Sequence, residues 1–173
     1  MLPSTIDKDT VFKADKLYIV GQDVVISEGV TVTFEEGCEI QFYDERAYYN
    51  SPSFIVYGTL NFEGTAENMI KLAPNQHHFY YTCNIINHGV VNISYMDAIN
   101  LNIQSKPYSG STTNAHIEDS YLKSNVAFNK AYLFTYTNGS IKNTDYRLCV
   151  ESLKRCYLDL FSALGSVYTS DLS

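Results

Sequence analysis

Asp145 and Asp171 come nearest, in type and spacing, to a catalytic pair. Both stand at the same place in a repeated segment, and Arg147 follows two residues after Asp145. If the repeats stack, the two carboxylates lie one repeat apart, where they could act as general acid and base in glycoside hydrolysis. They could instead hold calcium beside Arg147. Because single carboxylates mostly lie on solvated surface, we predict no catalytic residue and no cofactor, with calcium at these carboxylates as the alternative.

Two further groups of residues could bind a metal. His77 and His78 are adjacent, but adjacent residues of a strand point to opposite faces, and no acidic or cysteine partner stands nearby in sequence. The four cysteines form no C-x-x-C pair and lie in or beside apolar runs: Cys38, Cys83, Cys149 and Cys156. We predict no metal site, and we favour buried free thiols over two disulfides.

Tyrosine is abundant, with 15 in the chain, and its flat apolar face and polar tip suit stacking on sugar rings. Tyr95 and Tyr121 share one offset in the repeat, so they could form a two-coil stack that binds a ligand if the rings point outward. Three more candidates lie in the longest interruptions, 44–53 and 105–114: Tyr48, Tyr49 and Tyr108. These five are our predicted ligand-binding residues. Packing in the core or between coils is the ordinary alternative.

The elements that must position these residues are short strands with a long repeat. VNISYM begins at residue 91, IEDSYL at 117, IKNTDY at 141 and VYTSDL at 167, in steps of 26, 24 and 26 residues. A repeat of this length with two or three strands cannot bury an apolar face alone and must stack on its neighbours. The sequence therefore predicts an all-β parallel solenoid with coils of about 24 residues.

The bends between strands are visible in the stretch GVTVTFEEGCEIQF, residues 29–42. Apolar and polar residues alternate, the alternation breaks at Glu35-Glu36-Gly37, and it resumes at once. No crossover helix fits there and no Asn-Gly hairpin turn is present, so we expect the chain to turn onto the next side of the same coil. Asp119 and Asn143, two residues into their repeats, are candidates for left-handed backbone at such a bend.

Composition excludes several classes of partner. The formal net charge is −7 and only 18% of residues are charged, so the clustered Lys and Arg that nucleic acids and anionic membranes require are missing. No long apolar stretch or signal peptide is visible. We predict no nucleic-acid partner and no membrane insertion.

The stretches LYIVGQDVVISEGVTVTFEEGCEIQF and FIVYGTLNFEGTAENMIKL, within residues 17–72, resemble the N-terminal coils of right-handed parallel β-helix repeat proteins of bacterial cell surfaces. Ser27 and Glu36 stand where that family often has proline. The resemblance implies a right-handed coil, an extracellular or cell-surface location and a role connected with polysaccharides. Asn143-Thr144-Asp145 also matches a motif of polygalacturonase-type glycosidases, but Tyr146 replaces its glycine, and the later DD, GHG and RIK motifs are absent.

We expect residues 1–17 to form a lead-in or cap and residues 18–173 to form the coils. The family resemblance implies further coils and a cap, so the C-terminal end of this chain is expected to be truncated or covered by a partner. An open last coil would expose unpaired backbone groups and could support oligomer formation. A helix over 148–164 could cap the end instead, although the repeat matches on both sides favour strand.

Three functions are compatible with these features. The first is a non-catalytic surface β-helix that serves as a scaffold or binds a polysaccharide or a surface protein. The second is the N-terminal part of a polysaccharide-degrading lyase or glycosidase whose catalytic coils are mostly missing. The third is a structural protein of a phage or an adhesin. We favour the first, a protein that is not an enzyme.

Overall fold

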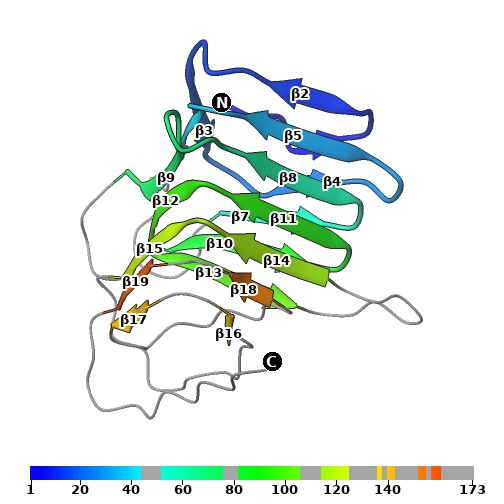
Figure 1. Ribbon diagram of the computed structural model, residues 1–173. Coiled ribbons are helices and arrows are strands. Elements are labelled where there is room, and N and C mark those ends of the chain that lie inside the picture. Colours follow the sequence, from blue (N-terminus) through cyan, green and yellow to red (C-terminus); the bar gives the residue numbers. More distant parts are fainter. Residues whose placement is uncertain are drawn as a thin grey trace.

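The computed structural model describes residues 1–43, 52–75, 82–105 and 114–124, together with the short strands 136–137, 140–142, 152–154 and 157–160. Within these ranges all regular structure is β-strand, arranged in three sheets whose pairings are parallel. The described residues contain no helix that could cross a membrane. The predicted all-β class is confirmed, and the three parallel sheets are consistent with a β-solenoid (Figure 1).

Each of the first five coils contributes one strand to each sheet, and sheets B and C contain two further strands each. Sheet A consists of β1 (Thr5–Ile6), β4 (Val24–Ile26), β7 (Ser53–Val56), β10 (Cys83–Asn87) and β13 (Leu101–Ser105). Sheet B consists of β2 (Thr10–Phe12), β5 (Thr31–Glu35), β8 (Thr59–Glu63), β11 (Val90–Ser94), β14 (Asn114–Glu118), β18 (Ser152–Lys154) and β16 (Tyr136–Thr137). Sheet C consists of β3 (Leu17–Val20), β6 (Glu39–Phe42), β9 (Ile70–Pro74), β12 (Met96–Ile99), β15 (Tyr121–Ser124), β19 (Tyr157–Leu160) and β17 (Ser140–Lys142).

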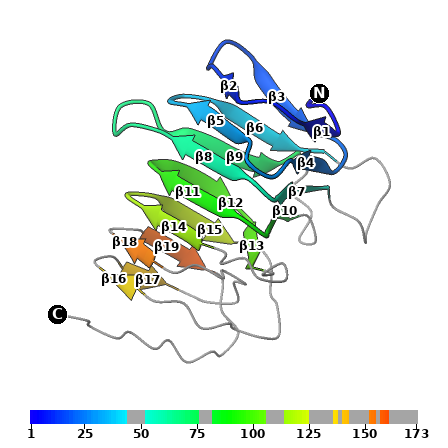
Figure 2. The same ribbon diagram turned by 90° about the vertical axis from the view of Figure 1, so that its right-hand side faces the viewer.

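The chain visits sheets A, B and C in turn and then returns to sheet A one level further along, as Figure 2 shows for the first five coils. Residues 29–42 illustrate the path, because β5 and β6 belong to different sheets and bend apart at Gly37. The backbone there is left-handed, with φ of 74° at Gly37. A glycine adopts this conformation without a Cβ clash, so the break in the alternation marks a corner of the coil.

The coil length is less regular than the sequence indicated. Val90 pairs with Asn114, 24 positions on, whereas Thr59 pairs with Val90, 31 positions on. The repeat starts were also aligned wrongly, because Ile117 pairs with Ile93 and not with Val91. Side chains alternate with a period of two, so a shift of two residues preserves the inward and outward pattern and escapes notice in the sequence.

Aromatic rings stack through the core along the coil axis. Phe34 of β5 lies 4.7 Å from Phe12 and 5.4 Å from Phe62, ring centroid to ring centroid, with interplanar angles of 22° and 11°. Phe54 and Tyr18 meet Phe34 edge-on, at 6.0 and 5.6 Å. Since Phe34, Phe54 and Phe62 are at most 1% exposed, these rings tie the first three coils into one core.

The corner between sheets B and C requires left-handed backbone in successive coils. Asp119 has φ of 49°, which confirms the conformation predicted for it, while Asn143 lies outside the described residues. Tyr95, 24 positions earlier, occupies the same corner with φ of 48°. Because left-handed backbone is rare for a bulky side chain, the sequence did not predict it at Tyr95.

Residues 1–17 contribute strands to the first coil. β1 and β2 pair with β4 and β5, and β3 begins at Leu17 and pairs with β6. The backbone N–H of Leu2 donates to the carbonyl of Ile19 at 2.8 Å, and the Leu2 side chain is buried. The lead-in and the first coil are therefore continuous, and the boundary at residue 17 stays a prediction.

The described part of the helix alternative at 148–164 consists of strands. β18 and β19 fall in that segment, so a helix over the whole of it is wrong and the favoured strand interpretation holds for these residues. In sheets B and C these two strands lie next to β14 and β15, and the earlier strands β16 and β17 lie beyond them. The order of strands along the axis thus departs from the order of the chain at this end (Figure 1).

Cys38 and Cys83 are buried free thiols, as predicted, and Cys149 and Cys156 lie outside the described residues. The Sγ of Cys83 donates to the carbonyl of Ile99 at 3.4 Å, and burial raises its pKa well above the ordinary value. Burial also raises the pKa of Cys38. The thiolate, which is the nucleophile, is therefore disfavoured at both positions.

We expect iodoacetamide to leave Cys38 and Cys83 unmodified in the folded protein at neutral pH and to alkylate both after unfolding. The physical reason is that neither side chain is accessible, at 0% exposure, or ionised. Peptide mass mapping of samples treated with and without denaturant measures this directly. Rapid labelling of Cys83 in the native protein would contradict the burial described.

Candidate ligand-binding groove

Six of the eight predicted site residues lie outside the described part of the chain: Tyr48, Tyr49, Tyr108, Asp145, Arg147 and Asp171. Their roles stay predictions. His77 and His78 also lie outside it. The two that the structure describes, Tyr95 and Tyr121, both lie at the corner between sheets B and C.

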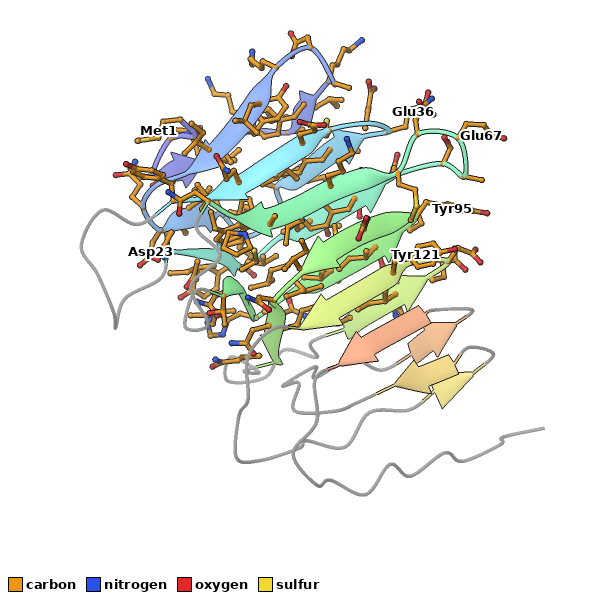
Figure 3. All side chains as sticks on the ribbon, turned by 90° about the vertical axis from the view of Figure 1, so that its left-hand side faces the viewer. Met1, Asp23, Glu36, Glu67, Tyr95 and Tyr121 are labelled. Atoms are coloured by element: carbon orange, nitrogen blue, oxygen red, sulfur yellow. The ribbon has the colours of Figure 1, made fainter. Side chains whose placement is uncertain are left out.

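Tyr95 and Tyr121 point outward from that corner on the same side of the molecule (Figure 3). Tyr121 is 48% exposed. The register nevertheless pairs Tyr121 with Asp97, while Tyr95 follows Ser94, the partner of Glu118. The two tyrosines are thus offset by two positions, which corrects the equal offset that the sequence indicated.

A cavity of about 310 Å³ lies on the outer face of sheet B, directly before this corner. Its floor consists of Phe62, Ile93 and Ile117, whose side chains turn into the core. The outward side chains around it come from β8, β11 and β14: Glu63, Asn92, Ser94, His116 and Glu118. We call this set, with its floor, the sheet B groove.

Two columns of outward residues form the sheet B groove, and parallel register sets both. One column runs through Thr33, Asn61, Asn92 and His116, each paired with the next. Asn92 Nδ2 donates to Asn61 Oδ1 at 2.9 Å, and Asn61 Nδ2 donates to Thr33 Oγ1 at 3.5 Å. This ladder of side chains joins three coils and fixes the amide of Asn92 at the groove.

The second column contains the carboxylates of the groove. Glu35 pairs with Glu63, Glu63 with Ser94, and Ser94 with Glu118. Since parallel strands lie about 4.8 Å apart, Glu63 and Glu118 are separated by roughly 10 Å across Ser94. Ser94 Oγ donates to the carbonyl of Phe62 at 3.3 Å. Lys154 of β18 follows Glu118 in the register.

Replacing Asn61 with alanine should lower the free energy of unfolding by about 1 kcal/mol, because the ladder loses its central member and water replaces it imperfectly. Urea unfolding followed by circular dichroism measures the difference. Thr59→Ala is the matched control, since Thr59 also points outward from β8 but stands outside the ladder. Equal effects of the two substitutions would show that the ladder adds nothing to stability.

The chemistry available in the groove is that of hydrogen bonding. Carboxylates accept, the amide of Asn92 both donates and accepts, and the hydroxyl of Ser94 can do both. Among the described residues no three His, Cys, Asp or Glu side chains gather as a metal site would require. The groove therefore suits a ligand with many hydroxyl groups, with the exposed ring of Tyr121 close by in the chain to stack on it.

Sequence reasoning missed the groove, although a signal for it exists. TLNFE at 59–63 and VVNIS at 90–94 both carry asparagine at the third place, flanked by apolar residues. The two segments are 31 positions apart, so an alignment at about 24 residues does not bring them together.

A second aromatic feature lies at the corner between sheets A and B. The rings of Tyr57 and His88 stack with centroids 4.7 Å apart and an interplanar angle of 7°. Each precedes a glycine, Gly58 or Gly89, and this repeated aromatic–glycine pair was the signal that the sequence offered. An aromatic stack between two coils, of the kind that the sequence suggested for Tyr95 and Tyr121, is thus formed by Tyr57 and His88 at the opposite corner of sheet B.

The chain matches no protein-family model, no curated protein and no solved structure.

Proposed function

We propose that this chain is a non-catalytic, surface-exposed β-solenoid module that binds glycans through the sheet B groove. The observation that carries the proposal is the groove itself, a cavity of about 310 Å³ lined by Glu63, Asn92, Ser94, His116 and Glu118. Its volume lies at the lower end of the range of roughly 300–1,000 Å³ for small-ligand sites. A short stretch of polysaccharide is a ligand of that size and polarity.

The groove is built on strands, which favours binding. Asn92 and Ser94 are held by hydrogen bonds to Asn61 and to the backbone of Phe62. A side chain already fixed in the free protein loses less conformational entropy when the ligand arrives. Tyr95 and Tyr121, the two described members of the predicted ligand-binding set, would extend the site around the corner.

The right-handed coil and the extracellular setting belong to the same proposal. Residues 17–72 carry the resemblance to right-handed β-helix proteins of cell surfaces. Parallel strands joined by a crossover in one sheet also follow the right-handed path in nearly all proteins. A polysaccharide of a cell surface or of an extracellular matrix is the ligand that such a location offers.

Binding to a panel of oligosaccharides tests the function: a chitin oligosaccharide, the chitosan oligosaccharide of the same length, and an oligogalacturonate. Isothermal titration should detect at least one ligand. Tyr121→Ala and Asn92→Ala should each weaken its binding about fivefold to tenfold. Each substitution removes one contact with the sugar, and one such contact contributes about 1 kcal/mol to the binding free energy.

Tyr57→Ala is the matched control, since it removes an exposed tyrosine from the other corner of sheet B. Thermal melts of all variants establish that they are folded. Unchanged binding by Tyr121→Ala and Asn92→Ala would place the ligand elsewhere. Release of shorter sugars during the titration would show an enzyme, and capture of none of the panel would favour the scaffold function.

A further inference from the structure

We infer that the sheet B groove selects glycans that carry a protonated amine, such as partly deacetylated chitin, over neutral and acidic ones. This inference rests on the proposed function and names its ligand class. It follows from three observations. Carboxylates line the groove, the lysines that form ion pairs in the described residues do so with other carboxylates, and tyrosines stand at the end of the groove.

Carboxylates accumulate at the end of sheet B that faces the corner. Glu35 and Glu63 stand directly opposite each other on β5 and β8, and Glu118 belongs to the same column. Glu36 and Glu67 occupy the loops of the same corner, on the side to which Tyr95 and Tyr121 point (Figure 3). Like charges on opposite residues of adjacent strands repel each other, so a cation placed between Glu35 and Glu63 would relieve this repulsion.

The described cations do not supply that relief. Lys71 of sheet C lies 2.7 Å from Glu39, and this hydrogen bond raises the pKa of the Lys71 ammonium. Lys16 pairs with Asp15 at 3.9 Å. Neither Glu35 nor Glu63 forms an ion pair with a described Lys or Arg. Glu63 pairs with Glu35, whereas Glu118 pairs with Ser94, so the Glu63 end of the groove is the more negative one.

The tyrosines at the corner also favour a ligand with a protonated amine. An ammonium group is attracted to the face of a tyrosine ring as well as to a carboxylate. Tyr121 begins β15 three residues after Glu118, and Tyr95 directly follows Ser94. A sugar chain that crosses the groove would bring its amino groups to Glu63 and its rings to Tyr121. A uronate would instead meet like charge.

Titrations with a chitosan oligosaccharide and with the same oligosaccharide fully N-acetylated test the inference, since the two differ only at the nitrogen, which is a protonated amine in the first and a neutral acetamide in the second. In low salt, at a pH that keeps the amine protonated, chitosan should bind about tenfold more tightly, the effect of one charge-assisted hydrogen bond. Oligogalacturonate should not bind. High salt should reduce the difference in affinity between the two oligosaccharides, because the charges are exposed and salt screens them.

The substitution Glu63→Gln removes one charge from the groove and should abolish most of the preference for chitosan. Glu28→Gln is the matched control, because Glu28 is exposed at the opposite corner of sheet B and should leave the preference intact. Glu118→Gln should have the smaller effect of the two groove variants, because Glu63 has a second carboxylate, Glu35, directly opposite it, whereas Glu118 stands opposite Ser94.

The outcomes distinguish a failure of the inferred amine preference from a failure of the proposed glycan binding. Equal binding of the two oligosaccharides at the groove, or binding of oligogalacturonate as tight as that of chitosan, would overturn the inference and leave glycan binding standing. A preference for chitosan that persists in Glu63→Gln would overturn it as well. Binding of none of the three would remove the proposed function and the inference together.

Discussion

Replacing Phe34 with alanine is expected to lower the free energy of unfolding by about 3–5 kcal/mol, the range for deleting a buried aromatic ring. Phe34 is fully buried and lies at the centre of the aromatic core, in contact with rings from the coil before it and the coil after it. The cavity left behind cannot collapse easily, because backbone hydrogen bonds fix the spacing of the strands above and below it. Thermal unfolding should therefore begin about 10 °C lower.

Val11→Ala is the control for this substitution. Val11 belongs to β2, on the same sheet, but its side chain is 56% exposed. Its loss should change stability by less than about 0.5 kcal/mol. Chemical denaturation of both variants gives the two values. A cost below about 1 kcal/mol for Phe34→Ala would mean that the rings do not form a continuous core.

A second large effect is expected for Gly58→Ala, at about 3 kcal/mol or more. A Cβ at this position would lie 2.1 Å from the carbonyl oxygen of Val30 and 2.5 Å from that of Ser27. The Val30 carbonyl cannot move aside freely, because it accepts the N–H of Thr59 at 2.8 Å. Coils approach each other too closely at this corner for any side chain.

Gly29→Ala measures the cost of left-handed backbone without the steric clash that a Cβ at Gly58 would cause. Gly29 has φ of 75°, yet nothing lies within 4 Å of a Cβ placed there. Its replacement should cost only the strain of left-handed backbone, roughly 1–2 kcal/mol. Urea unfolding compares the two. A smaller loss for Gly58→Ala than for Gly29→Ala would contradict the tight stacking of coils at Val30, Gly58 and Gly89.

The fold was predictable because its signals are local. Alternation in residues 29–42 identified two strands and the bend at Gly37, and Asp119 was recognised as a residue suited to left-handed backbone. Stacking followed from the need of short strands to bury one face. Register was not predictable, because a coil with a longer bend still alternates correctly.

The candidate groove depends on that register, which explains why the sequence did not indicate it. Glu63 and Glu118 stand 55 positions apart and meet in one column only because successive coils take 31 and 24 residues. The 24-residue alignment singled out Tyr95 and Tyr121 as equivalent positions instead. Both do lie at the corner beside the groove, although they are two positions out of register.

The outer face of sheet B is proposed to hold a glycan. A crystal structure of the protein soaked with the tightest-binding oligosaccharide tests it most directly. Sugar density is expected over β8, β11 and β14, with hydroxyl or amino groups within hydrogen-bond distance of Glu63 and Asn92 and a ring near Tyr121. A sugar bound on sheet A or sheet C, with the groove empty, would contradict it.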